Sequence, residues 1–346
     1  MAEIKVGIIG ATGYTGSELV RLLLGHSNVS IDVVTSRSHA GKRFSTLHPQ
    51  FETLFDEELE PTEAVADHEL DVVFLALPHG VSMDFVAQYG VEKHRVIDLS
   101  GDFRLAEPAM YKKWYRTAHR AQEALESAVF GLPELFRQRI RGARLVANPG
   151  CYPTSAILAL APLVKRGLID PKTLIVDAKS GVTGAGVKPS ATTHFAHVFG
   201  NFSAYGLLKH RHTPEIESAV GRYGGRDVQA LFTPHLLPID RGILTTVYAT
   251  PTDPKPDPNS FQDALDATYE KERFVRVVDR APDVKSVRGS NFCDLHATYD
   301  KRTGRVVILS VIDNLVKGAA GQAVQNMNVM FGQLEHRGLS SAPLTP

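Results

Sequence analysis

Hydrophobic residues in the N-terminal part of the chain form short continuous runs at residues 4–9, 31–35, 71–77 and 95–99. Runs of this length and continuity are typical of parallel strands that are buried on both faces of a sheet. Residues 17–24, between the first two runs, have helical character and are followed by a glycine. The pattern predicts a strand–helix–strand unit at the N-terminus and an open α/β sheet around it.

From Val228 onward the pattern changes to longer strand-like runs, including residues 242–249, 291–300 and 305–310. The last two runs are joined by a Lys-Arg-Thr-Gly turn, which predicts a β-hairpin. We therefore expect a second domain of α+β type with a mainly antiparallel sheet. The length of 346 residues also suits roughly two domains.

Lys and Arg together number 38, and so do Asp and Glu, so the formal net charge is zero. This balance disfavours nucleic acid and membrane surfaces as partners. The chain has only two cysteines, Cys151 and Cys293, a charged first segment, and no run of about 18 apolar residues. We therefore expect a cytoplasmic protein with neither a disulfide nor a membrane span.

A glycine-rich turn, GATGYTG at residues 10–16, lies between the first predicted strand and the first predicted helix. Glycines in this context let the backbone approach a pyrophosphate, whose charge the helix N-terminus stabilises. The GxxGxxG spacing is a variant, but the strand–turn–helix context favours dinucleotide binding over an ordinary glycine turn. The residues expected to contact the dinucleotide are Gly10, Thr12, Gly13, Tyr14, Thr15 and Gly16.

The end of the second strand indicates which dinucleotide is bound. An NAD site places an acidic residue there, about 20 residues beyond the glycines, to bind the ribose hydroxyls. This chain has instead Ser36, Arg37 and Ser38, with Lys42 and Arg43 close behind. Because cationic side chains suit a 2′-phosphate, we expect NADP(H). The alternative is that Arg37 is a solvated loop charge.

The turns that follow the next two strands are further candidates, because loops at the carboxyl ends of parallel strands line the ligand crevice. The first turn is expected to contact the cofactor through Leu77, Pro78 and His79. The second, residues 100–104, ends in Arg104, which is suited to bind a substrate carboxylate. The alternative for Arg104 is a local ion pair with Asp98 or Asp102.

Residues 148–155 (NPGCYPTS) place Cys151 at a turn between a strand-like run and an apolar helix that begins near Ala156. Pro153 is typical of the first turn of a helix, where its missing N–H has no partner in any case. The positive end of the helix dipole lowers the pKa of a nearby thiol, so Cys151 is a candidate nucleophile. The alternative is a buried structural cysteine. Cys293 alternates with apolar residues in a predicted strand, so we expect it in the core.

Residues 180–188 follow a predicted strand at residues 173–179 and contain three glycines, two hydroxyl side chains and Lys188. This composition suits phosphate binding by backbone N–H groups, although a plain flexible loop is the alternative.

His210 and His212 precede a predicted helix start, with Thr213 as the cap and Pro214 and Glu215 in the first turn. Histidine suits general acid/base catalysis because its pKa lies near neutrality. The alternatives are a basic surface turn or a metal-binding His-x-His pair. No further ligands occur at a diagnostic spacing, so we expect no metal.

A nicotinamide cofactor, a thiol nucleophile, a histidine and anion-binding loops together indicate reductive dephosphorylation of an acyl phosphate, or its reverse. Oxidation of an alcohol does not need a thiol. The thiolate would form a thioester with loss of phosphate, and hydride transfer would then give an aldehyde.

Six motifs spread over nearly the whole chain resemble those of the N-acetyl-gamma-glutamyl-phosphate reductase family. They lie at residues 10–16, 77–80, 98–104, 148–154, 210–215 and 313–318. That family makes N-acetylglutamate semialdehyde with NADPH in arginine biosynthesis, and it shares its architecture with aspartate-semialdehyde and glyceraldehyde-phosphate dehydrogenases. The resemblance implies an NADP-binding Rossmann domain over residues 1–149, completed by a C-terminal helix within residues 315–346. It also implies a glyceraldehyde-3-phosphate-dehydrogenase-like catalytic and oligomerisation domain over residues 150–314.

The resemblance further implies that Cys151 is the nucleophile and that His212, or alternatively His210, is the acid/base. The additional cofactor contacts expected are Ser180, Gly181, Gly184, Ala185, Asn314 and Gly318. The substrate contacts expected are Arg104, Asn148, Lys179, Ser180 and Glu215. A homo-oligomer, either dimer or tetramer, is also expected. Gly101 stands where the family pattern leads us to expect alanine.

Three alternatives remain at this point. The main one is a reductase of lysine biosynthesis that acts on an aminoadipyl phosphate linked to a carrier protein, although the residues beside the cysteine differ there. The second is a short-chain dehydrogenase, since Tyr89 and Lys93 fit a Tyr-x-x-x-Lys pair. The third is a non-catalytic NADP-binding redox sensor.

Overall fold

The fold is that of a computed structural model, which describes residues 3–345. The chain forms two compact units. The first comprises the chain up to Pro149 together with Ala319–Ser340. The second comprises Gly150–Gly318 with the residues from Ser341 onward.

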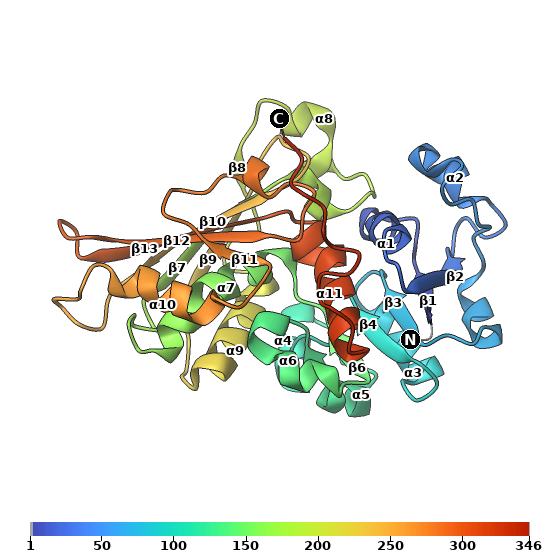
Figure 1. The fold of residues 1–346 in the computed structure, drawn as a ribbon, viewed down its shortest axis with the longest axis horizontal. Helices are drawn as coiled ribbons and strands as arrows, with labels where there is room; N and C mark the ends of the chain where they lie inside the picture. Colours follow the sequence, from blue (N-terminus) through green and yellow to red (C-terminus); the bar gives the residue numbers. More distant parts are fainter. Residues whose placement is uncertain (1–2, 346) are drawn as a thin grey trace. The chain divides into compact units, whose positions relative to one another are not determined.

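The first unit contains a six-stranded sheet with the strand order β2-β1-β3-β4-β6-β5, in which every paired strand is parallel (Figure 1). Its strands are β1 (Ile4–Ile9), β2 (Val29–Thr35), β3 (Val72–Leu75), β4 (Arg95–Asp98), β5 (Val129–Phe130) and β6 (Leu145–Ala147). All residues of β3 and β6 are buried, as the continuous apolar runs predict.

Within residues 3–345, six helices of the first unit lie between these strands in the chain, and a seventh follows the last strand of the second unit. They are α1 (Tyr14–Leu24), α2 (Phe44–Leu47), α3 (Val81–Tyr89), α4 (Pro108–Tyr115), α5 (Gln122–Ser127), α6 (Pro133–Arg141) and α11 (Gly321–Met330). Every residue of α11 is buried, so this C-terminal helix is part of the core of the first unit. α1 begins at Tyr14, inside the glycine-rich turn and three residues earlier than the apolar pattern indicates.

The second unit contains a seven-stranded mixed sheet with the order β11-β12-β13-β10-β7-β9-β8. Its strands are β7 (Leu174–Ser180), β8 (Ser203–Ala204), β9 (Ala230–Leu236), β10 (Ile243–Ala249), β11 (Val275–Val277), β12 (Cys293–Asp300) and β13 (Arg305–Ile312). β12 and β13 form the predicted hairpin, and four of the six strand pairs are antiparallel.

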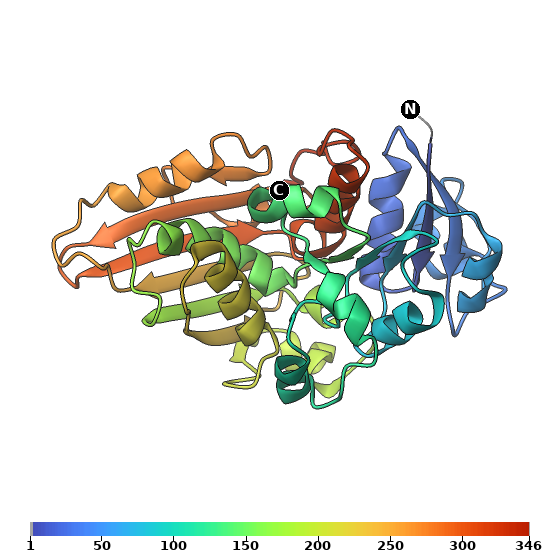
Figure 2. The same cartoon turned by 90° about the horizontal axis from the view of Figure 1, so that it is seen from below.

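Helices cover one face of this second sheet, as Figures 1 and 2 show. They are α7 (Cys151–Lys165), α9 (His212–Gly224) and α10 (Ser260–Tyr269), while the short α8 (Phe195–Val198) lies in the long connection between β7 and β9. α7 is buried from Tyr152 to Val164, and its Ser155 Oγ bonds to Thr245 Oγ1 on β10 and Ser310 Oγ on β13. The helix is therefore fixed to the middle of the sheet.

Two predicted helix starts were too late. α7 begins at Cys151, before both Pro153 and the predicted start of the apolar run near Ala156, and α9 begins at His212 rather than after a cap at Thr213. In both helices the proline is the third residue. Proline is tolerated there because none of the first N–H groups of a helix has a partner within the helix. His212 therefore belongs to the helix and does not precede it.

None of the helices within residues 3–345 has the length and apolar content that a membrane span requires. Across the same residues, no three His, Cys, Asp or Glu side chains are grouped as they would be in a metal site.

Candidate active site

Cys151 is the first residue of α7, and Gly150 is the N-cap, with an extended backbone. The Gly150 N–H donates to Glu215 Oε1 over 2.8 Å, and Glu215 is a buried residue of α9. The Thr154 N–H and the Thr154 hydroxyl both donate to the Gly150 carbonyl, each over 2.9 Å. The turn that presents Cys151 is thus fixed on both sides, and the thiol lies at the positive end of a 15-residue helix.

A second segment packs directly against this cysteine. A Cβ atom placed on Gly318 would lie 2.8 Å from Cys151 Cβ and 3.1 Å from Cys151 Cα, which is closer than carbon atoms pack. Gly318 closes a turn whose first residue is Asp313, because its N–H donates to the Asp313 carbonyl over 2.9 Å. Only glycine fits beside Cys151 at this position.

The two histidines lie together at the start of α9. Their ring centroids are 4.7 Å apart, and the His212 N–H donates to His210 Nδ1 over 3.2 Å. Tyr152, which follows Cys151 directly, has its ring 5.8 Å from that of His210 and 5.9 Å from that of His212. The structure therefore brings the cysteine turn and both predicted histidines into one cluster.

The surroundings of His210 keep its imidazole neutral. Burial and, to a lesser degree, the neighbouring Arg211 charge lower the pKa of His210 to about 4. Because Nδ1 accepts the hydrogen bond from the His212 N–H, the proton of the neutral ring is assigned to Nε2. His210 can therefore act as a hydrogen-bond donor at neutral pH but cannot take part in proton transfer as a base through Nδ1.

Tyr205 belongs to the same cluster but has no signal in the sequence. Its hydroxyl donates to Tyr152 Oη over 3.1 Å, and Tyr152 Oη donates to the His235 carbonyl over 3.0 Å. Burial raises the pKa of Tyr205 to about 12 and that of Tyr152 further, so both hydroxyls stay protonated. Residue 205 lies in an irregular stretch after β8, where no periodicity would have indicated it.

The 180–188 loop follows β7 and contains a single 3₁₀ turn at Val182–Ala185. A Cβ atom on Gly181 would lie 2.6 Å from the Asp240 carbonyl oxygen, so this glycine is required by the neighbouring loop. Ser180 is buried, whereas Gly184, Ala185 and Lys188 are exposed. Lys179 Nζ pairs with Asp177 over 2.9 Å on the half-buried face of β7.

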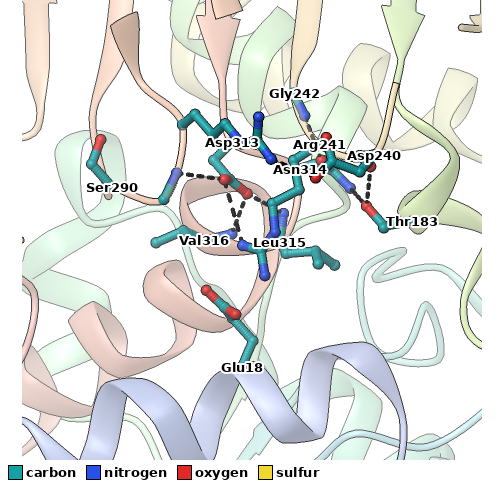
Figure 3. A network of polar contacts seen from close by, with 12 residues as sticks. Glu18, Thr183, Asp240, Arg241, Gly242, Ser290, Asp313, Asn314, Leu315 and Val316 are labelled. Atoms are coloured by element: carbon teal, nitrogen blue, oxygen red, sulfur yellow. Dashed lines mark hydrogen bonds and ion pairs between the residues drawn. The ribbon is translucent and has the colours of Figure 1, made fainter. Parts of the chain in front are cut away.

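Side chains from the end of β13 hold this loop in place (Figure 3). Asn314 Nδ2 donates to Thr183 Oγ1 over 2.9 Å, and Asn314 Oδ1 accepts from the Gly242 N–H over 2.7 Å. Thr183 Oγ1 in turn donates to the Asp240 carbonyl over 2.6 Å. Asn314 was expected to contact the cofactor. In the structure its amide oxygen and its amide nitrogen both form hydrogen bonds within the second unit.

The glycine-rich turn of the first unit fits a bound pyrophosphate. Gly10 has φ +86°, and a Cβ atom there would lie 2.6 Å from the Ala76 carbonyl oxygen. A Cβ atom on Gly16 would be equally close to the Ala11 backbone. At Gly13, the N-cap of α1, nothing lies within 4 Å of the Cβ position, so the backbone at the helix N-terminus is open to an anion.

At the tip of β2, Ser36 is buried and its hydroxyl lies 3.4 Å from Thr12 Oγ1, whereas Arg37 and Ser38 are exposed. Arg37 forms no ion pair with any residue in the described part of the chain. Arg43, by contrast, is paired with Asp56 and also donates to the Asp56 carbonyl. Of the two arginines predicted near the tip, Arg37 is the one available for a ligand.

The loops after β3 and β4 are fixed to each other. The Gly101 N–H donates to His79 Nδ1, and the buried Asp102 carboxylate accepts from the Gly80 and Met83 N–H groups. The alanine expected at position 101 would place its Cβ 2.0 Å from Tyr115 Oη. An alanine at this position would therefore require the Tyr115 ring to shift.

Arg104 and Asn148 are both buried at the carboxyl ends of β4 and β6. Arg104 donates to the backbone carbonyls of Asn148 and Leu99 over 2.8 and 2.9 Å. The Asn148 amide donates to the Ala319 carbonyl and accepts from Asn326. These contacts tie strand ends and α11 together within the first unit.

Comparison with known proteins identifies the family of both units. Residues 5–143 match the family described as "Semialdehyde dehydrogenase, NAD binding domain", and residues 151–314 match "Semialdehyde dehydrogenase, dimerisation domain". Two curated relatives named N-acetyl-gamma-glutamyl-phosphate reductase are similar over essentially their full length. The protein of Desulforudis audaxviator is 50% identical over 99% of this chain and 100% of its own. The protein of Pelotomaculum thermopropionicum is 51% identical over 99% of both chains.

Solved structures share the fold at low sequence identity. The crystal structure of aspartate semialdehyde dehydrogenase II from Vibrio cholerae, complexed with ASA, has a TM-score of 0.73 at 16% identity and covers 96% of this chain and 99% of its own. The enzyme from Candida albicans, crystallised with NADP, has a TM-score of 0.70 at 16% identity and covers 95% of this chain and 99% of its own. The predicted fold class, an N-terminal dinucleotide-binding α/β domain followed by an α+β domain of the architecture that glyceraldehyde-3-phosphate and semialdehyde dehydrogenases share, is confirmed.

Proposed function

The chain belongs to the N-acetyl-gamma-glutamyl-phosphate reductase family, and we propose that it reduces N-acetyl-L-glutamyl 5-phosphate to N-acetyl-L-glutamate 5-semialdehyde and phosphate with NADPH, in arginine biosynthesis. It is an oxidoreductase of the semialdehyde dehydrogenase type. This membership disfavours both the short-chain dehydrogenase and the non-catalytic redox sensor. The observation that carries the proposal is the position of Cys151 at the N-terminus of α7, next to Tyr152, whose ring contacts both histidines.

In the proposed reaction the Cys151 thiolate attacks the acyl carbon of the acyl phosphate. A C–S bond forms, and the C–O bond to the phosphate group breaks as phosphate leaves with the electron pair. When bound, the reduced nicotinamide cofactor supplies a hydride to the acyl carbon. The C–S bond then breaks, which releases the aldehyde and regenerates the thiolate.

His212 is the proposed acid/base. Hydride addition to a thioester leaves negative charge on the former carbonyl oxygen, and a histidine can donate a proton to it and take the proton back when the C–S bond breaks. His210 is unsuited to this role because its pKa is about 4 and its Nδ1 accepts the hydrogen bond from the His212 N–H. We assign His210 the role of a neutral hydrogen-bond donor through Nε2.

The residues proposed to hold the cofactor are those whose geometry fits it. The open backbone at Gly13 and the N-terminus of α1 suit the pyrophosphate. The exposed Arg37 at the tip of β2 suits the 2′-phosphate and supports NADP(H) over NAD(H).

We also propose a cytoplasmic homo-oligomer, a dimer or a tetramer, assembled through the second unit. The match to a dimerisation domain supports it. So does the sheet face opposite α7 and α10, where Ile175, Leu231 and Tyr248 are 42%, 49% and 40% exposed.

The proposal is tested by assaying phosphate-dependent reduction of NADP by N-acetylglutamate semialdehyde. We expect turnover that requires phosphate and falls at least tenfold when NAD replaces NADP, roughly the binding free energy that one charge-assisted contact contributes.

Arg37→Glu should remove the preference for NADP. Arg302→Glu, which changes an exposed arginine in the β12–β13 turn, should leave it unchanged. An unchanged preference in Arg37→Glu would refute the NADP assignment. Activity only with a carrier-linked substrate would instead support the alternative function, an aminoadipyl-phosphate reductase of lysine biosynthesis.

A further inference from the structure

The connection between β7 and β9 carries a group of exposed apolar side chains. Five of them lie within residues 195–208 and are each at least 55% exposed: Phe195, Phe199, Phe202, Leu207 and Leu208. Single exposed apolar residues are common on proteins, but a group of this density is typical of an interaction site. The sequence from 189 to 208 contains no Asp, Glu, Lys or Arg. We call residues 195–208 the apolar arm.

The apolar arm passes along the edge of the second sheet and contacts both of its faces. β8, which lies within the arm, is the edge strand and pairs antiparallel with the end of β9. Just before β8, the ring of Phe202 lies 5.2 Å from that of His235. Just after it, the Tyr205 hydroxyl donates to Tyr152 Oη on α7.

The Phe202 end of the arm continues the sheet face that we propose as the oligomer interface. His235 lies four residues after Leu231 on β9, so both side chains point to the face opposite α7. On that face Ile175 is the cross-strand partner of both Leu231 and Tyr248. Figure 1 shows α8, the helical part of the arm, on the side of the sheet away from α9 and α10. The arm and the exposed sheet face thus form one surface.

The Tyr205 end of the arm reaches the candidate active site. The Tyr205 N–H donates to the Pro234 carbonyl over 3.1 Å, and its ring lies 5.6 Å from that of His210. Its hydroxyl bonds to Tyr152, the residue directly after Cys151. A single short segment therefore connects the exposed apolar surface to the neighbour of the cysteine.

A second copy of this chain is the partner that these observations favour. The apolar arm lies entirely within residues 151–314, which match a dimerisation domain. Its lack of charged residues is typical of the core of a homodimer interface, whereas membrane-surface helices carry Lys and Arg beside their apolar face. Leu208 has φ +59° and a side chain that is 75% exposed. Packing of that side chain against a partner would offset the backbone strain.

We propose that the apolar arm packs against a second copy of the chain and that this packing holds Tyr205 against Tyr152. Phe195 and Phe199, whose rings are stacked with centroids 5.1 Å apart, are the anchors of the interface. Tyr205 is a positioning residue that acts on the active site through Tyr152. The inference rests on the proposed function, because it takes Cys151 to be the nucleophile of an oligomeric enzyme. Assembly through the arm is then required for full activity.

The test measures the association state by sedimentation velocity, and kcat/KM of the same samples, over a series of protein concentrations. Phe195→Asp/Phe199→Asp changes two exposed positions, so the single chain should fold as the wild type does. We expect the dissociation constant of the assembly to rise at least tenfold, because two carboxylates would be buried in an apolar interface. Where this variant is dissociated, kcat/KM should be at least about fivefold lower, and it should recover as the protein concentration rises.

Two controls separate the interface from a general effect of exposed substitutions. Leu54→Asp is matched, because Leu54 is 69% exposed and belongs to the first unit, outside the apolar arm. It should keep the association state and the activity of the wild type. Phe195→Leu/Phe199→Leu keeps apolar side chains in the arm and should restore most of the association.

Tyr205→Phe tests the positioning role by removing only the hydroxyl that bonds to Tyr152. It should leave the association state unchanged and lower kcat about fivefold, roughly the contribution of one hydrogen bond. In the dissociated Phe195→Asp/Phe199→Asp variant the same change should cost less than about twofold, because both changes act through one connection. A fivefold loss in both backgrounds would show that Tyr205 acts independently of assembly and would overturn the coupling.

Full kcat/KM in a dissociated Phe195→Asp/Phe199→Asp variant would also overturn the inference, and so would a variant that stays assembled. The failures of the two proposals are distinguishable. A monomeric wild type with phosphate-dependent turnover would refute the assembly and leave the proposed reaction standing. An assembled wild type without phosphate-dependent turnover would refute the reaction, and with it the positioning role, while the association data would still decide whether the arm is an interface.

Discussion

The two cysteines of this chain lie in contrasting surroundings. Cys151 is partly exposed at the N-terminus of α7, and the ring of the next residue, Tyr152, contacts His210 and His212. Cys293 is buried within β12, and its Sγ lies 3.5 Å from Ser310 Oγ. Both are thiols of the same intrinsic chemistry, so any difference in their reactivity comes from position alone.

Three features support the proposal that Cys151 is the reactive thiol: a helix N-terminus, access to solvent, and a neighbouring tyrosine whose ring contacts two histidines. Cys293 has none of the three. It shares Ser310 with Ser155, the α7 residue that fixes the helix to the sheet, so its role is packing beneath the same helix.

Replacing the nucleophile should have the largest effect. Cys151→Ser should lower kcat/KM by at least about 10⁴-fold, because an alcohol is a far poorer nucleophile at neutral pH and no thioester can form. Steady-state kinetics with the semialdehyde, NADP and phosphate measures this. Activity within tenfold of the wild type would exclude covalent catalysis by Cys151.

The next effect concerns the two histidines. His212→Asn should lower kcat by about 10²- to 10⁴-fold and flatten the pH–rate profile, the scale of a lost general acid/base. His210→Asn should cost less, about tenfold, and should keep the profile, because His210 is already neutral. A profile that flattens in His210→Asn and not in His212→Asn would reverse the assignment.

Crowding the cysteine from behind should have a smaller effect. Gly318→Ala would put a methyl group 2.8 Å from Cys151 Cβ, so the thiol must move by several tenths of an ångström. We expect kcat to fall about tenfold with a changed rate of Cys151 alkylation, since misplacement of a reacting group is costly. Gly142→Ala is the matched control, because nothing lies within 4 Å of its Cβ position.

His210 also makes stability depend on pH. Its pKa is lowered in the folded chain, so the unfolded chain binds a proton first as the pH falls below about 6.5. Its contribution to stability is therefore complete above that pH and is lost progressively toward pH 4. His210→Asn should show a smaller drop in Tm between pH 7.5 and pH 5 than the wild type does. The exposed His194→Asn should show the wild-type drop, and an equal drop in both variants would contradict the assignment.

The smallest effect is expected at the second cysteine. Cys293→Ala should cost about 1 kcal/mol in the free energy of unfolding, because it leaves a small void in a closely packed strand. Its kcat/KM should stay within about twofold of the wild type. Urea denaturation and the activity assay measure the two quantities. A large loss of activity in a folded Cys293→Ala variant would show that the division between the cysteines is wrong.

Much of the fold could be predicted from the sequence because buried strands have a local signature. The apolar runs that became β1, β3 and β4 needed no long-range information, and neither did the alternation that placed Cys293 inside β12. The helix starts were less accurate. Pro153 and Pro214 fit any position in a first turn, so they indicate a helix start only to within a few residues.

The contacts that position the site could not be predicted, because they join residues distant in sequence. Asn314 reaches Gly242 across 72 positions, and Tyr152 reaches Tyr205 across 53. Neither periodicity nor motif spacing predicts these hydrogen bonds, because they depend on how β10 and β13 lie beside β7 and β9 in the sheet. Gly101 shows the same limit, because the Tyr115 hydroxyl that occupies the space beside it comes from a residue 14 positions further along the chain.

In the proposed reaction Cys151 forms a thioester with the substrate's acyl group. This is measured directly by intact-protein and peptide mass spectrometry after mixing the enzyme with N-acetylglutamyl phosphate in the absence of cofactor, with quenching in acid. We expect one acyl adduct per chain, located on the peptide that contains Cys151, sensitive to hydroxylamine, and absent in Cys151→Ser. An adduct on Cys293, or turnover by an enzyme that never carries an adduct on Cys151, would contradict it.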